Sequence, residues 1–126
     1  MLKRCLAKLF SLIVVKKIES TYNKAPELQA NILKQLIKKA KTTEFGTDHN
    51  FSNIFSHKDF CNNVPVRDYE QLSRYIEKIK EGCENILWPG KPKYFAKTSG
   101  TTSGAKLIPI TKESMPNHIK SARNAL

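Results

Sequence analysis

Residues 94–111 hold the side chains that are best suited to do chemistry. Two short apolar runs flank a block of small residues, and a single cation follows that block. The block and its cation are Thr98, Ser99, Gly100, Thr101, Thr102, Ser103, Gly104, Ala105 and Lys106. Such a run fits neither a packed helix nor a core strand, but it is dense in backbone N–H groups and hydroxyls. Its composition suits a polyanion, most often a phosphate chain.

The spacing of the block excludes two common phosphate loops. A Walker A motif needs four residues between its glycines, then Lys followed by Ser or Thr. Here three residues separate Gly100 from Gly104, and Leu107 follows Lys106. The G-x-G-x-x-G fingerprint of dinucleotide-binding folds is absent as well. A Ser/Thr/Gly-rich surface loop without function is the alternative interpretation.

The runs at 93–97 and 106–110 favour two strands that present this block as the connection of a β-hairpin. Upstream, apolar residues at helical spacing predict a helix over about 2–20 and an amphipathic one beginning near Pro26. Residues 42–53 are expected to form a loop, with Gly46 as a turn signal. The aromatic anchors expected in and after this loop are Phe45, Phe51 and Phe55.

Cap signals place the remaining elements. Ser56 and Asp59 predict a capping box that opens a short helix. Val64-Pro65-Val66 is expected to be extended, because the residue before a proline avoids the helical region. Asp68 then caps a longer helix that Gly82 ends. The apolar residues on one side of this helix are expected to be Tyr69, Leu72, Tyr75, Ile76 and Ile79. Residues 85–92 form a turn-rich lead-in, and Thr111 is expected to cap a last helix. That helix carries Met115, Ile119, Ala122 and Leu126.

Charge is distributed unevenly along the 126 residues, whose net charge is +11. Residues 1–41 hold ten Lys and Arg against two Glu. This basic third favours a rival hypothesis, a non-catalytic module that binds nucleic acid or an anionic membrane surface. The simpler interpretation is a solvated helical face, since no aromatic residues alternate with these lysines to stack on bases. A third hypothesis is a helical interaction fragment.

Cysteines and apolar runs indicate the compartment. Cys5, Cys61 and Cys83 are odd in number and form no C-x-x-C pair, which favours a reducing cytosol. His49, His57 and His118 are equally scattered, so no metal site is predicted, and His49 is expected to be a surface or hydrogen-bonding residue rather than a ligand. The apolar run at 9–15 is shorter than the ~20 residues of a membrane span. No cleavage site follows it, so we expect a cytoplasmic protein without a membrane span.

A longer pattern covers residues 95–106. It reads aromatic or aliphatic, two free positions, Thr-Ser-Gly-Thr-Thr, Ser or Gly, any residue, a small residue and Lys, and the chain matches it throughout. This pattern resembles the phosphate loop of adenylate-forming enzymes. The flanking motifs Thr43-Glu44-Phe45-Gly46, Asn50-Phe51, Val64-Pro65-Val66-x-x-Tyr69 and Ile86-Leu87-Trp88-Pro89-Gly90 narrow the resemblance. Together they resemble the amino-terminal region of the auxin-responsive acyl-acid amido synthetase family, and most nearly its bacterial members.

The resemblance implies a function. Members of this family activate a carboxylic acid with ATP as an acyl-adenylate and join it to an amine such as an amino acid. ATP, with Mg²⁺ accompanying the nucleotide, is therefore the expected cofactor, and no nucleic-acid partner is expected. The implied nucleotide-binding residues are Thr98, Ser99, Gly100, Thr101, Thr102, Ser103, Gly104 and Lys106. Lys106 either supplies charge to the phosphates or fixes the loop by pairing with a carboxylate. Lys97 is expected on a strand surface.

One departure concerns the spacing. Plant members usually carry one more residue between the second glycine and the lysine, whereas Gly104-Ala105-Lys106 keeps the spacing of the wider superfamily. Adenylation is therefore better supported than amino-acid conjugation.

The expected fold is α/β, the amino-terminal fragment of an adenylate-forming enzyme fold, mostly helical with a β-hairpin carrying the phosphate loop. Residues 1–126 would be an incomplete part of the large domain of such an enzyme. The later tyrosine–acid nucleotide segment of these enzymes is missing, because no tyrosine follows Tyr94 and the only acid after Glu84 is Glu113. The adenine, acyl and acceptor sites are thus expected in the remainder of a longer parent chain. No catalytic residue is assigned.

Overall fold

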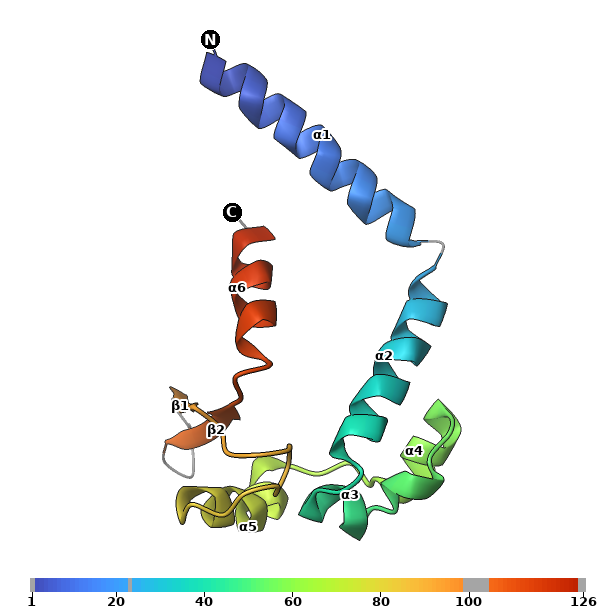
Figure 1. Cartoon of the computed structure of the whole chain (residues 1–126), viewed down its shortest axis with the longest axis vertical. Coiled ribbons are helices and arrows are strands. Elements are labelled where there is room, and N and C mark those ends of the chain that lie inside the picture. Colours follow the sequence, from blue (N-terminus) through green and yellow to red (C-terminus); the bar gives the residue numbers. More distant parts are fainter. Residues whose placement is uncertain (1, 23, 99–104, 125–126) are drawn as a thin grey trace. The chain divides into compact units, whose positions relative to one another are not determined.

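The computed structural model describes residues 2–22, 24–98 and 105–124. In these ranges it contains six α-helices, one 3-10 helix and a two-stranded antiparallel sheet, a mostly helical arrangement (Figure 1). The chain divides into two compact units, residues 1–35 and residues 36–126. The predicted hairpin and the motifs upstream of it from Thr43 onward belong to the second unit.

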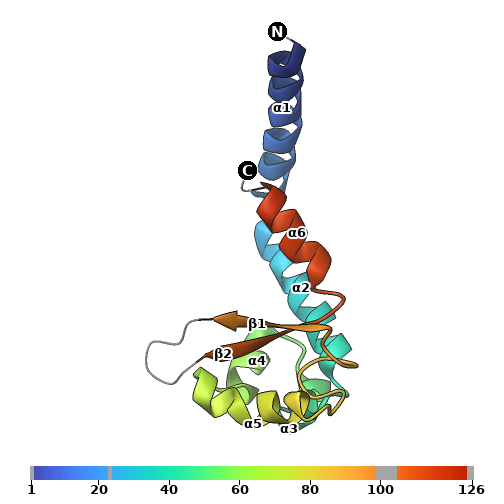
Figure 2. The same ribbon diagram turned by 90° about the vertical axis from the view of Figure 1, so that its left-hand side faces the viewer.

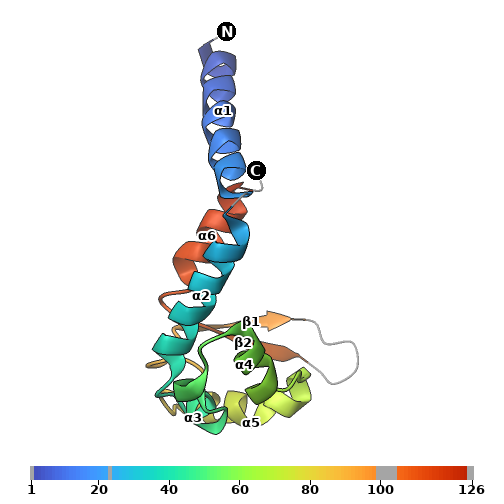
Figure 3. The same cartoon turned by 90° about the vertical axis from the view of Figure 1, so that its right-hand side faces the viewer.

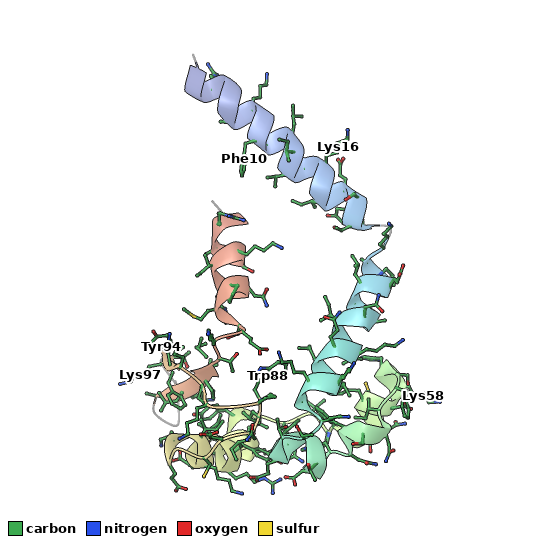
Figure 4. The ribbon with its side chains drawn as sticks, viewed as in Figure 1. Phe10, Lys16, Lys58, Trp88, Tyr94 and Lys97 are labelled. Atoms are coloured by element: carbon green, nitrogen blue, oxygen red, sulfur yellow. The ribbon has the colours of Figure 1, made fainter. Side chains whose placement is uncertain are left out.

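The first unit holds α1 (Leu2–Tyr22) and most of α2 (Ala25–Ala40). Both helices were predicted, and Pro26 lies in the first turn of α2, where a missing N–H costs nothing. Large apolar side chains of α1 are exposed, including Phe10 at 65% and Ile13 at 61% (Figure 4 labels Phe10 and Lys16). No helix in the described part of the chain has the length and apolarity needed to cross a membrane.

A tight corner joins α2 to α3 (Glu44–Asp48). The Thr43 hydroxyl donates to the Ala40 carbonyl at 2.7 Å and accepts from the Gly46 N–H at 3.0 Å. A Cβ on Gly46 would lie 2.1 Å from the Ala40 carbonyl oxygen, so only glycine fits against the end of α2. The prediction of a loop over residues 42–53 is wrong, because α3 lies within this range. Gly46 is a close-approach residue inside a helix rather than a turn residue.

The lead-in segment closes the amino-terminal end of α3. The N–H groups of Glu44 and Phe45 donate to the carbonyls of Asn85 and Ile86, at 2.8 and 3.0 Å. With Thr43 capping Gly46, the first three N–H groups of α3 all have partners, as buried helix ends require. Asn85 adopts a left-handed conformation, and its side chain accepts from the Gly90 N–H at 2.8 Å. Residues 85–90 are thus a structured turn docked on α3.

The aromatic anchors are partly as predicted. A 3-10 helix, η1 (Phe51–Asn53), follows α3, and Phe51 in it is buried. Phe45 packs against the core and meets the Phe51 ring edge-on at 5.8 Å. Phe55 is 74% exposed, so its prediction as an anchor is wrong. It precedes the cap of the next helix, where its N–H donates to Asp59 and its ring points outward.

The two predicted caps are confirmed. Ser56 and Asp59 form a reciprocal capping box on α4 (His57–Asn63). Asp68 and Gln71 form another on α5 (Tyr69–Lys80). The carboxyl end of α5 has Gly82 at φ +94°, with the N–H groups of Gly82 and Cys83 donating to the carbonyls of Ile79 and Lys78. This is a Schellman motif, which only a residue tolerant of positive φ allows at low cost.

The core of the second unit gathers around α5. Tyr75, Ile79 and Ile86 form its buried cluster, with Phe45, Leu72 and Leu87 packed against them. Ile37, Ala40, Phe51, Ile54 and Ile76 are also buried. The core thus joins α5 to α3 and to the lead-in segment, so α5 is fixed from several sides.

The hairpin pairs β1 (Tyr94–Thr98) with β2 (Lys106–Ile110), close to the predicted strands. Helix α5 contacts β2 and runs below the hairpin in two side views (Figures 2 and 3). All five residues of β1 are exposed, whereas β2 is mostly half-buried.

The last helix, α6 (Met115–Asn124), begins later than predicted. Thr111 accepts from the Ser114 N–H at 3.1 Å and so caps the turn before α6. Its prediction as the helix cap is wrong, because Pro116 is tolerated only in a first turn and a helix starting at residue 112 would bury it deeper. Ile119 on α6 is 64% exposed, and Leu126 lies outside the described residues.

Candidate functional site: the mouth of the β-hairpin

Thr98 and Lys106 are the two predicted site residues that the structure describes, and they face each other at the mouth of the hairpin. Thr98 ends β1, Lys106 begins β2, and they are partners in the register. The other predicted site residues lie outside the described ranges: Ser99, Gly100, Thr101, Thr102, Ser103 and Gly104. Their assignment therefore stays a prediction.

The alternation of the ladder shows how the mouth is closed. Leu107 turns its N–H and its carbonyl toward Tyr69, away from β1. In an antiparallel pair, adjacent residues then turn their backbone groups the other way, so Lys106 and Ile108 bond to β1. Hydrogen-bonded partners have Cα atoms about 5.5 Å apart. The two ends of the small-residue block are thus held side by side.

Pro109 confirms this alternation. It pairs with Phe95 and is two residues from Leu107, so its nitrogen also faces away from β1. A proline has no N–H to donate and is tolerated at a sheet edge. The outer edge of β2 therefore presents only one N–H in this region, that of Leu107, and Tyr69 satisfies it.

The Tyr69 hydroxyl occupies the position that a third strand would take. It accepts from the Leu107 N–H at 2.9 Å and donates to the Leu107 carbonyl at 3.3 Å. A phenol can do both, since it carries one donor and two acceptor lone pairs. The Tyr69 ring meanwhile lies under the Lys106 ammonium, whose Nζ is 5.3 Å from the ring centroid. One side chain therefore holds two successive residues of β2.

Lys106 and Lys97 differ in their surroundings. Among the described residues no carboxylate pairs with Lys106, and the Tyr69 ring is its neighbour instead. Lys97 lies on β1, exposed and pointing away from the hairpin (Figure 4), as expected for a strand surface. It pairs with Leu107, so it belongs to the opposite face of the ladder from Thr98 and Lys106.

The sequence predicts Tyr69 on a helix but does not predict its contact with Leu107 and Lys106 of β2. It is the first residue of α5, directly after the Asp68 cap, so the capping box fixes its position. The sequence pattern treated it as one of the apolar residues along that helix. The signal that could have found it is the polar tip of an aromatic residue at a helix start, within the Val64-Pro65-Val66-x-x-Tyr69 motif.

A polar network around the buried Tyr75 keeps α5 in place under the hairpin. The Tyr75 side chain is fully buried, and its hydroxyl donates to the Asp48 carboxylate at 2.7 Å. Arg74 donates to the same carboxylate at 2.8 Å and to the Tyr75 hydroxyl. Burial, and then the bond to Asp48, raise the pKa of Tyr75. Lys78 pairs with Glu44 at 2.7 Å, so α3 and α5 are joined at two points.

A second polar cluster joins α2 to the segments that flank the hairpin. Glu113 pairs with Lys39 at 2.5 Å and accepts from the Trp88 indole N–H at 3.3 Å (Trp88 is labelled in Figure 4). The bonds from Lys39 and, more weakly, from Trp88 lower the pKa of Glu113. Lys39 also lies 5.8 Å from the Trp88 ring centroid. The cluster therefore connects the Trp88-Pro89-Gly90 motif to the turn before α6.

The histidine at the end of α3 is a structural residue. His49 is buried at 4% exposure, and its Nδ1 donates to the Phe45 carbonyl at 2.8 Å. Its ring stacks on Phe45 with centroids 4.1 Å apart. The prediction of a hydrogen-bonding histidine is confirmed. In the described residues no three His, Cys, Asp or Glu side chains are grouped to hold a metal ion.

The second unit is mostly helical, and its helix α5 contacts an antiparallel hairpin whose strands are joined by a Ser/Thr/Gly-rich sequence. Residues 14–126 match the GH3 family N-terminal domain. The chain therefore belongs to the GH3 family, which is the family of auxin-responsive amido synthetases that the motifs indicated.

Several plant enzymes are similar to the chain. The indole-3-acetic acid-amido synthetase GH3.2 of Arabidopsis thaliana is 29% identical over 103 residues, covering 80% of this chain and 19% of that enzyme. The jasmonoyl–L-amino acid synthetase JAR6 of Nicotiana attenuata is 28% identical over 104 residues, covering 81% and 18%. The probable indole-3-acetic acid-amido synthetase GH3.13 of Oryza sativa subsp. japonica is 41% identical over 58 residues, covering 44% and 12%. The chain thus spans less than a fifth of the length of these relatives.

Proposed function

We propose that residues 1–126 are the amino-terminal part of an ATP-dependent acyl-acid ligase, which activates a carboxylate as an acyl-adenylate and transfers it to an amine such as an amino acid. Two observations carry this proposal: residues 14–126 match the amino-terminal domain of the family, and residues 95–106 fit the adenylating pattern on a hairpin that holds Thr98 beside Lys106. The same match favours an enzyme over a basic binding module.

The proposed reaction has two steps. A carboxylate oxygen attacks the α-phosphorus of ATP, forming the acyl-adenylate and releasing pyrophosphate. The amine then attacks the acyl carbon, forming the amide and releasing AMP. In the first step negative charge stays on the phosphates and the leaving pyrophosphate, and pre-oriented donors and cations stabilise it best.

The hairpin supplies such groups in this proposal. Lys106 is available as the cation, because its described neighbour is an aromatic ring rather than a carboxylate. Hydroxyl and backbone N–H donors come from Thr98, Ser99, Thr101, Thr102 and Ser103, and Gly100 and Gly104 allow the phosphates to approach the backbone. Mg²⁺ bound to the nucleotide would neutralise part of the phosphate charge.

The partners proposed for this chain are a small carboxylic acid and an amine, in the cytoplasm. The names of the relatives support the acid and the amine: one is an amido synthetase of indole-3-acetic acid and another a synthetase of jasmonoyl–L-amino acids. The groups that bind adenine, the acid and the acceptor are proposed to lie in the rest of a longer parent chain, as the short coverage of each relative supports.

ATP–pyrophosphate exchange by the full-length protein tests the proposal. Labelled pyrophosphate enters ATP only if the enzyme forms an acyl-adenylate reversibly. We expect exchange that depends on one or more acids from a panel of aromatic and aliphatic carboxylates. Absence of exchange with every acid, together with no binding of ATP, would contradict the proposed function.

A further inference from the structure

We propose that Tyr69 is a positioning residue for nucleotide binding: from the start of α5 it fixes Lys106, and so sets where the cation meets the phosphates. This inference deepens the proposed function and rests on it. Tyr69 itself is not proposed to touch the nucleotide.

The contacts of Tyr69 support a positioning role. Its hydroxyl makes two bonds to Leu107, and its ring lies 5.3 Å from the Lys106 Nζ. These are the first two residues of β2, directly after the small-residue block. A lysine carries three rotatable donors on a flexible stem, so an unsupported one samples many positions. Tyr69 contacts the head of Lys106 and holds the backbone of the next residue, Leu107, and this removes much of that freedom before the ligand arrives.

The lysine head stays available for an anion. A cation over an aromatic ring at an exposed site is held more weakly than one that bonds to a charged acceptor. A carboxylate partner would neutralise the charge, whereas the ring leaves the ammonium with its full charge and its donors unused. The aromatic contact therefore orients Lys106 without competing strongly with a phosphate.

The support for Tyr69 is rigid. The Asp68–Gln71 capping box fixes the first turn of α5. One turn and a half further along, Tyr75 anchors the same helix to Asp48 on α3 through its buried hydroxyl. Tyr69 and α5 thus connect Lys106 to the core of the unit. Among the described residues, Tyr69 alone bonds to the N–H and the carbonyl of Leu107 at the outer edge of β2.

The test is Tyr69→Phe in the full-length protein, with Tyr94→Phe as the matched control. The first change removes the hydroxyl and keeps the ring under Lys106. The second removes the same atom from an exposed tyrosine of the same hairpin, which makes no described hydrogen bond through it. The measurements are KM for ATP, KM for the acid and kcat in the exchange assay, together with the hydrogen exchange of the peptide covering residues 105–110.

We expect Tyr69→Phe to raise KM for ATP or lower kcat so that kcat/KM for ATP falls about 5- to 30-fold, the effect of one or two lost hydrogen bonds. KM for the acid stays unchanged, and the 105–110 peptide exchanges faster. For Tyr94→Phe, the two KM values, kcat and the hydrogen exchange of the 105–110 peptide all match those of the wild type. A purely structural role would not change the ATP constant alone.

Two adverse results are distinguishable. If the wild type catalyses exchange and Tyr69→Phe does so with the same constants for ATP, the positioning role is overturned while the proposed function stands. If the wild type neither exchanges nor binds ATP, the proposed function fails and this inference fails with it.

Discussion

The packing of the corner between α2 and α3 predicts how Gly46→Ala changes the free energy of unfolding. The sign of that change discriminates between two interpretations of Gly46. Gly46 lies in a helix and has no positive φ, so helix propensity alone predicts that alanine would stabilise the fold by about 0.5–1 kcal/mol. The packing predicts the opposite. A Cβ would lie 2.1 Å from the Ala40 carbonyl oxygen and 3.0 Å from the Ala40 carbonyl carbon, where ordinary contacts begin at 3.4 Å.

The magnitude follows from what must move. The obstacle is backbone, so α3 has to shift away from α2 by about 1.3 Å, the difference between 2.1 Å and the 3.4 Å of an ordinary contact. Backbone shifts forced by overpacking cost about 1–3 kcal/mol. That shift also strains the two bonds of the buried Thr43 hydroxyl, at 2.7 and 3.0 Å. Since these bonds contribute about 1 kcal/mol each, we expect Gly46→Ala to lose about 2–4 kcal/mol of unfolding free energy.

Urea unfolding of the 126-residue chain measures this loss, followed by the fluorescence of Trp88, the single tryptophan of these residues. Gly82→Ala is the control: a Cβ there meets nothing within 4 Å, and only its φ of +94° opposes alanine. The control should lose about 1–2 kcal/mol, the cost of a left-handed conformation. A Gly46→Ala protein as stable as the wild type, or more stable, would refute the packing argument.

Two further predictions concern pH. Because burial and Asp48 raise the pKa of Tyr75, its neutral phenol stabilises the fold fully below about pH 10, and that contribution is lost as pH rises through the folded pKa. Absorbance titration should show one phenol ionising late and with unfolding, and Tyr75→Phe should abolish this step; an unchanged titration would contradict it. For Glu113, whose pKa Lys39 lowers, the stabilisation is present above the ordinary carboxyl pKa and is lost as pH falls through the lowered one. Glu113→Gln should therefore destabilise the protein at neutral pH and have no effect in strong acid, as thermal melts at the two pH values would show; an equal effect at both would argue against the Lys39–Glu113 pair.

Local patterns sufficed for much of the fold. The two capping boxes and the glycine at the end of α5 were predicted because caps are satisfied within a few residues of the chain. The strands were predicted because short apolar runs flank a block that cannot be helix or strand. The motifs also identified the family, since their order and spacing are specific where any single one is not.

The failures arose where a distant contact decides the outcome. Gly46 looks like a turn residue in sequence, but the carbonyl of Ala40 requires glycine within a helix. The N–H groups that start α3 are satisfied by carbonyls some 40 residues later, at Asn85 and Ile86, which no local pattern reveals. Tyr69 was assigned to the apolar face of a helix, while its hydroxyl reaches a strand 38 residues away. Sequence spacing thus indicated which groups could bind phosphate, but not what holds them.

The most direct test of the central claim, that the mouth of the hairpin binds the phosphates of ATP, compares two lysines of the same hairpin. Lys106→Gln and Lys97→Gln each remove one charge, from opposite faces of the ladder. In ATP–pyrophosphate exchange by the full-length protein, we expect Lys106→Gln to lower kcat/KM for ATP about tenfold or more, as for a lost charged hydrogen bond. We expect wild-type constants for Lys97→Gln. Equal constants for Lys106→Gln and the wild type, or equal losses in both variants, would contradict the claim.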